Sequence, residues 1–277
     1  GGNLTVESNT ELHVDGGKTF APGGNITTQG TGGIHVDDSA VLTGASTQTH
    51  VSASSIAIDT SATYTAPTTG SITAPDMTVA GTFTGGGTTL TLNGTSGTLL
   101  TRTGTFTAGT STVVFNGDGS ATALTSGTFQ TTNAFNNVSL TPAISTAGRT
   151  YAFGSGALTI DGNLLIEPSG TQLLTVQMGA DITVAPGKTT TIQATGSATS
   201  SLDLRPSSTD YNLSSGLLVI GTGGTLDGTS TTASTITLTG TSGTLFTRSG
   251  TFAAGGSTVV FNPDSAVTLT SGTFQTT

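Results

Sequence analysis

The chain has 277 residues, of which 41 are glycine, 8% are charged and none is cysteine. Its formal net charge of -9 and its six basic residues leave no basic patch, which argues against nucleic acid as a partner. The lack of cysteine excludes disulfides and thiolate metal sites. No apolar run approaches the roughly 20 residues of a membrane-spanning helix, so we expect no membrane insertion. Helix-forming runs of Leu, Ala, Glu and Lys are nearly absent, and we expect an all-β protein.

The first predicted elements are short strands that recur at a fixed spacing. GGNLTVESNTELHVDGG, at 1–17, returns as GGNITTQGTGGIHVDDS at 23–39, and a third copy of the register follows. The corresponding residues are Leu4 and Ile26; Leu12, Ile34 and Ile56; Val14, Val36 and Ile58; Asp15, Asp37 and Asp59; and Phe20, Leu42 and Tyr64. Within each copy apolar and polar residues alternate between turn-forming residues, which predicts two or three short strands with one buried face.

Further along the chain the repeat continues through Gly-Thr-Phe or Gly-Thr-Leu triplets. These lie at 81–83, 104–106, 127–129, 224–226, 250–252 and 272–274. The first three are evenly spaced, whereas the interval between the triplets at 224–226 and 250–252 is longer. An insertion of about three residues in one loop explains the longer interval.

Short strands that recur at this spacing, with no helices between them, predict a parallel β-solenoid, or β-helix. In this fold the chain coils so that each strand pairs with its equivalent one turn earlier, about 4.8 Å away. Dividing the length by the period predicts about 12 coils of about 22–23 residues each. We expect one continuous solenoid over residues 1–277.

A longer repeat is superimposed on the short one. The segment 91–132 returns as 237–277, with 33 of 41 aligned positions identical and Gly119 deleted. We therefore predict the duplication of a block of about 145 residues, covering about 77–220 and, in truncated form, 221–277. Because open solenoid ends expose unpaired backbone groups and a bare core, we expect a segment of a longer chain or a subunit that another copy continues.

The most specific polar feature is an aspartate ladder formed by Asp15, Asp37 and Asp59, each of which directly follows an inward position. Two interpretations are open. The aspartates cap the backbone at a corner, as Asp commonly does in turns. Alternatively, they bind a cation such as Ca²⁺, which relieves the repulsion between their carboxylates. No other cofactor is expected.

Histidine and acidic positions raise two further alternatives. His13 and His35 occupy equivalent outward positions, where a stacked pair can bind a metal or respond to pH, although Ala57 fills the third position. Acidic groups on neighbouring coils are also similar to the carboxylate sites of β-helical polysaccharide hydrolases. Such sites need side chains that grip a sugar. Only the two histidines, Lys18 and Tyr64 lie near the ladder, so we expect that the protein is not an enzyme.

Three stretches define the repeat style of the chain. They are SGTLFTRSGTFAAGGSTVVFNPDSAVTLTSGTFQTT at 242–277, FNNVSLTP at 135–142 and YAFGSGALTIDGNLLIEPSG at 151–170. In this style the chain resembles the very long, repetitive extracellular proteins of bacteria, especially of uncultured candidate phyla. More broadly, its coil pattern is similar to that of filamentous-haemagglutinin-type adhesins. The resemblance covers most of the chain, carries no catalytic motif, and implies an extracellular or cell-surface rod.

We therefore expect a structural protein, a rod-like segment or subunit of a cell-surface filament or stalk. Its partner would be itself, end to end, or neighbouring repeats of a longer chain, joined by strand stacking. A second hypothesis is an adhesin whose outer face binds glycan or a host surface. An adhesin is expected to vary its loops, whereas the two repeated blocks are nearly uniform. A polysaccharide-active β-helix enzyme is the third hypothesis.

Overall fold

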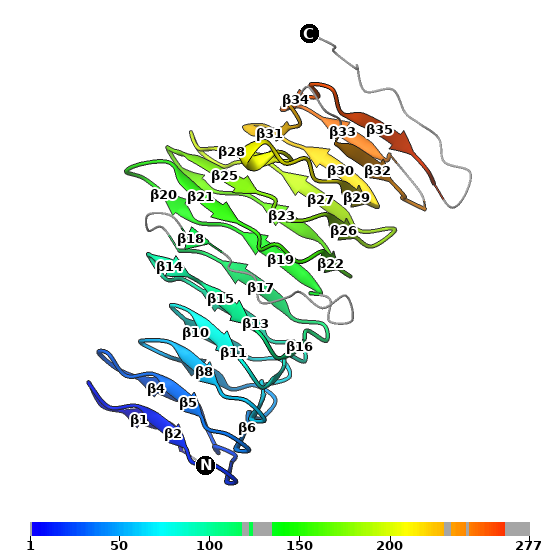
Figure 1. Ribbon diagram of the computed structural model, residues 1–277. Coiled ribbons are helices and arrows are strands. Elements are labelled where there is room, and N and C mark those ends of the chain that lie inside the picture. The colour runs from blue at the N-terminus through cyan, green and yellow to red at the C-terminus, as the bar shows by residue number, and fades with distance from the viewer. Residues whose placement is uncertain (1, 118–121, 124–134, 230–233, 242–243, 264–277) are drawn as a thin grey trace. The chain divides into compact units, whose positions relative to one another are not determined.

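The computed structural model describes residues 2–117, 122–123, 135–229, 234–241 and 244–263. The chain is all-β, and its parallel strands stack into a β-solenoid of about ten turns (Figure 1). This confirms the predicted fold class. Among the described residues the only helical turn is η1 (Pro206–Ser208), and none of their helices is long and apolar enough to cross a membrane.

The chain divides into two compact units, residues 1–138 and 139–277. Whether they form one continuous solenoid stays a prediction. In the first unit each of the first five coils gives one strand to each of three parallel sheets, and β17 (Thr112–Phe115) adds a sixth strand to the first sheet. The first sheet contains β1 (Leu4–Val6), β4 (Ile26–Thr28), β7 (Thr49–Val51), β10 (Ser71–Ala74), β13 (Thr89–Leu92) and β17 (Thr112–Phe115). The second contains β2 (Leu12–Val14), β5 (Ile34–Val36), β8 (Ile56–Ile58), β11 (Met77–Val79) and β15 (Leu100–Arg102). The third contains β3 (Thr19–Phe20), β6 (Val41–Thr43), β9 (Thr63–Thr65), β12 (Thr82–Thr84) and β16 (Thr105–Thr107). The short strands β14 (Gly97–Thr98) and β18 (Thr122–Ala123) pair with each other.

The second unit, which the chain enters through β19 (Asn137–Leu140), has the same three-sided plan. One sheet contains β23 (Leu164–Ile166), β27 (Thr189–Ile192), β30 (Leu217–Ile220) and β33 (Phe246–Arg248). Another contains β21 (Arg149–Ala152), β25 (Leu173–Gln177), β28 (Thr199–Asp203), β31 (Gly224–Asp227) and β34 (Thr251–Ala253). The last contains β22 (Leu158–Ile160), β26 (Ile182–Val184), β29 (Leu213–Ser215), β32 (Thr235–Leu238) and β35 (Thr258–Phe261). The two-residue strands β20 (Ala143–Ile144) and β24 (Ser169–Gly170) also pair.

Strand register confirms the repeat predicted for the first unit. Leu12 pairs with Ile34, which pairs in turn with Ile56. Leu42 likewise pairs with Tyr64. From the second coil onward these inward side chains are fully buried, so the core is a column of stacked aliphatic and aromatic residues.

Most turns of the second unit are longer than the sequence period predicts. In the first unit Leu4 pairs with Ile26, so one turn takes 22 residues. In the second unit Ile182 pairs with Leu213, and this turn takes 31 residues because it includes η1. The other turns of that unit also differ in length among themselves. Variable loops therefore reduce the expected count of about 12 turns to about ten.

The duplicated segment folds alike in both of its copies. The strands β13, β15, β16 and β17 correspond to β32, β33, β34 and β35, and the displacement along the chain is the same for all four. The two copies rest on different neighbours, because β16 pairs with β12 whereas β34 pairs with β31. One coil sequence can thus stack on unlike coils. The Gly-Thr-Phe triplets at 127–129 and 272–274 lie outside the described residues.

The repeated GGN motif has a local structural cause. The Asn25 backbone N–H donates to Asn3 Oδ1 at 3.1 Å, and the Thr49 N–H donates to Asn25 Oδ1 at 2.9 Å. Asparagine side chains therefore satisfy backbone donors between successive coils. A Cβ on Gly24 would lie 2.6 Å from the Gly2 carbonyl oxygen, which explains why only glycine fits before this asparagine.

Replacing Asn25 by alanine is expected to lower the free energy of unfolding by about 1–2 kcal/mol, because the Thr49 N–H loses its acceptor. Asn25→Asp keeps an acceptor oxygen at the same place and should remain within about 0.5 kcal/mol of the wild type. Urea denaturation followed by circular dichroism measures both. Equal losses in the two variants would show that this hydrogen bond is not the cause.

Candidate functional site

The aspartate ladder lies at one corner of the first unit, immediately after β2, β5 and β8. The backbone carbonyl of each aspartate accepts a hydrogen bond from the N–H three residues later, at 2.8 to 3.0 Å. The residue two positions after each aspartate has a positive φ: Gly17 at 70°, Ser39 at 63° and Ser61 at 65°. Each aspartate therefore begins a tight turn, which agrees with the corner interpretation.

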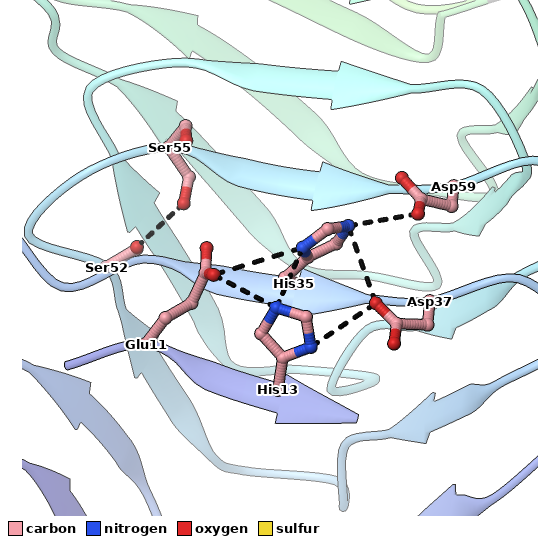
Figure 2. Close-up of polar contacts among 7 residues, drawn as sticks. All are labelled: Glu11, His13, His35, Asp37, Ser52, Ser55 and Asp59. Atoms are coloured by element: carbon pink, nitrogen blue, oxygen red, sulfur yellow. Dashed lines mark hydrogen bonds and ion pairs between the residues drawn. The ribbon is translucent and has the colours of Figure 1, made fainter. Parts of the chain in front are cut away.

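The side chains of His13 and His35 lie against Asp37 and Asp59, as Figure 2 shows. His13 Nδ1 is 3.4 Å from Asp37 Oδ1, and His35 Nε2 is 3.0 Å from Asp59 Oδ2. His35 Nε2 also lies 3.6 Å from Asp37 Oδ1. The ring nitrogens His13 Nε2 and His35 Nδ1 face each other at 3.1 Å.

A further member of the cluster, Glu11, was not predicted from the sequence. Its Oε2 lies 3.1 Å from His13 Nε2 and 3.9 Å from His35 Nδ1. Glu11 precedes β2 and lies two residues before His13, so period-two alternation puts both side chains on the outer face. This alternation is the one sequence signal that could have placed Glu11 beside His13. The equivalent positions in the next two coils are Gly33 and Ser55, so Glu11 is not part of a repeated row of acids in the sequence.

The structure brings all three predicted aspartates to this cluster. Ligand atoms of His13, Asp15 and Asp37 lie within 4.8 Å of one another, as do those of His35, Asp37 and Asp59. The expected stack of carboxylates is therefore interleaved with imidazoles. The two histidines, Asp37 and Asp59 are 26% to 45% exposed, so a cation from solvent can reach them. Imidazole nitrogen and carboxylate oxygen together are ligands that suit zinc-like ions.

A second polar group lies inside the solenoid, around the third histidine. His50 is fully buried, and its ring nitrogens contact Tyr64 Oη at 2.5 Å and Gln48 Oε1 at 3.2 Å. Gln48 Nε2 in turn donates to the Pro22 carbonyl at 2.6 Å. A neutral imidazole with its proton on Nε2 satisfies this chain, because it accepts from Tyr64 and donates to Gln48. Burial lowers the pKa of His50 to about 4.

The position of His50 explains its burial. It pairs with Ile26 on one side and Ile72 on the other, so it fills an inward aliphatic position of the first sheet. The Tyr64 ring is likewise fully buried, and burial raises its pKa. We assign this network to stabilisation of the core rather than to binding.

Comparison with family models, with curated proteins and with solved structures finds no match for the chain. The architecture is that of a β-solenoid built from repeats. Its expected relationship to bacterial cell-surface proteins has no support beyond repeat style.

Proposed function

We propose that the chain is a structural, extracellular or cell-surface protein, a segment or subunit of a filament or stalk that grows by stacking coil on coil. The observation that carries the proposal is the duplicated block. The same strand set stacks on β11 and β12 in the first unit and on β30 and β31 in the second. Coils that accept different neighbours through the same backbone pairing are suited to open-ended growth.

The first coil supplies the surface on which another coil would stack. Its inward residues Leu4, Leu12 and Phe20 remain partly exposed. Their partners one coil later are fully buried; these are Ile26, Ile34 and Leu42. A preceding coil, from the same longer chain or from a second copy, would bury this apolar surface and pair the strand edge.

The backbone of β1 suggests a variant that blocks this edge alone. The Leu4 N–H donates to the Asn25 carbonyl and the Val6 carbonyl accepts from the Gln29 N–H, so both residues face β4. Successive residues of a strand turn their backbone groups to opposite sides, and the Thr5 N–H therefore faces away from β4. Proline at this position removes the outward donor and leaves the bonds to β4 in place.

We expect the wild-type chain to form end-to-end filaments at high concentration in negative-stain electron microscopy. Thr5→Pro should shorten or abolish them, whereas Thr5→Val, which keeps the N–H and the β-branched shape, should leave them intact. Circular dichroism and urea denaturation verify that both variants fold. Monodisperse short particles of the wild type would contradict assembly, and equal filament yields in both variants would contradict assembly through β1.

A further inference from the structure

We infer that Glu11, His13 and His35 form a binding site for a divalent transition metal ion of the zinc class. Three ligand atoms converge there: Glu11 Oε2, His13 Nε2 and His35 Nδ1. Their separations are 3.1, 3.1 and 3.9 Å. Ligands about 2.0–2.1 Å from a tetrahedral zinc ion lie roughly 3.3 Å apart, so these atoms already have nearly the required spacing.

The acids on the far side of each ring favour the tautomers in which the converging ring nitrogens can bind a metal ion. A carboxylate oxygen only accepts, so Asp37 and Asp59 favour the tautomers that carry the proton on the ring nitrogens facing them. His13 Nδ1 faces Asp37 and His35 Nε2 faces Asp59, at 3.4 and 3.0 Å. In those tautomers His13 Nε2 and His35 Nδ1 present lone pairs to the centre of the cluster. Without an ion, Glu11 Oε2, at 3.1 Å, favours a proton on His13 Nε2 instead, and metal binding would release that proton. A bound cation would take the place of any proton between these three atoms and would be held by all of them.

The same contacts place carboxylates on the side of each ring where metal-binding histidines need them. A histidine ligand usually donates its second N–H to a carboxylate, which orients the ring and raises its basicity. Asp37 and Asp59 are placed for this role on both rings (Figure 2). The cluster is therefore more than a group of acids, because two imidazoles are each held between a converging centre and an orienting carboxylate.

The ligand set selects the class of ion. Calcium prefers six to eight oxygen ligands, whereas two imidazole nitrogens and one carboxylate suit zinc and its neighbours in the transition series. With three protein ligands and partly exposed side chains, the fourth position is left to water. The aspartate ladder thus changes role: Asp37 and Asp59 orient the ligands, and Asp15 is not required. This inference does not depend on filament assembly.

The experiment titrates the full chain with Zn²⁺ at neutral pH against a chromophoric chelator. We expect one ion per chain, with His13→Ala and His35→Ala each weakening binding by at least about tenfold and Asp59→Asn by about tenfold. Asp38→Asn is the matched control, because Asp38 is an exposed acid next to Asp37 that belongs to none of the clusters. Its affinity should equal that of the wild type. X-ray absorption should show two imidazole nitrogens in the coordination shell.

The alternative of a calcium-binding aspartate ladder gives the opposite pattern. If it holds, Asp15→Asn weakens binding, excess Ca²⁺ displaces Zn²⁺, and the histidine variants bind normally. Our assignment requires Asp15→Asn to bind Zn²⁺ like the wild type and excess Ca²⁺ to have no effect. Failure of the wild type to bind Zn²⁺ more tightly than the double variant His13→Ala/His35→Ala would overturn it.

Discussion

Replacing Phe106 by alanine is expected to lower the free energy of unfolding by about 3–5 kcal/mol. Phe106 is fully buried within an aromatic stack that runs through successive coils of the first unit. Its ring centroid lies 4.8 Å from that of Phe83 and 5.2 Å from that of Phe135. Alanine leaves a cavity that a stacked column cannot close without shifting neighbouring coils, so both transfer and cavity costs apply.

The duplicated block provides a matched control for this substitution. Phe252 occupies the same place in the second copy, in nearly the same sequence, but its ring is partly exposed. The Phe252 ring buries less apolar surface in the folded protein than the Phe106 ring does. Phe252→Ala should therefore lower the free energy of unfolding by only about 1–2 kcal/mol. Urea denaturation of the two variants compares the losses directly. Equal losses of unfolding free energy would contradict the claim that the burial of the ring, and not the surrounding repeated sequence, determines the cost of the substitution.

Acidification is expected to destabilise the protein through His50, by about 3 kcal/mol between pH 6.5 and pH 4. In the unfolded chain the imidazole has a pKa near 6.5, whereas burial lowers the folded-state pKa to about 4. Above pH 6.5 both states are neutral and the stabilisation is complete. As the pH falls toward 4, the unfolded state binds a proton that the folded state does not, so stability is lost.

His50→Gln isolates this effect, since the amide keeps an acceptor for Tyr64 and a donor for Gln48 but does not titrate. The pKa values of Asp76 and Asp203 are raised by burial and act in the opposite direction, but both residues are present in each protein. The difference between the two stability curves, measured by urea denaturation from pH 7.5 to pH 4, should therefore grow as the pH falls. Parallel curves would show that His50 is not the buried group that resists protonation.

The fold could be predicted because the inward residues repeat. The spacing of Leu12, Ile34 and Ile56 indicated the register directly, and backbone pairing between coils follows from it. The number of turns could not be predicted as well. Loops on the outside of a solenoid are free to lengthen without disturbing the core, as the turn from Ile182 to Leu213 shows.

The candidate site was predictable only in part, because some of its residues recur in successive coils and others do not. Asp37 and His35 recur at equivalent positions, so their alignment with Asp59 and His13 was visible in the sequence. Glu11 has no counterpart in the next coils, and its approach to both imidazoles depends on side-chain reach across a coil. The aspartate ladder follows from the repeat and could be predicted from it. The cluster also contains Glu11, which departs from the repeat and could not be predicted in this way.

Fibre diffraction from oriented filaments of the wild-type chain tests the central claim, growth by coil stacking, most directly. Stacked coils place every strand perpendicular to the filament axis, with neighbouring strands about 4.8 Å apart along it. The pattern should therefore show a reflection at about 4.8 Å on the meridian. Filaments whose strand-spacing reflection lies away from the meridian, or a wild-type chain that forms no filaments, would contradict the account.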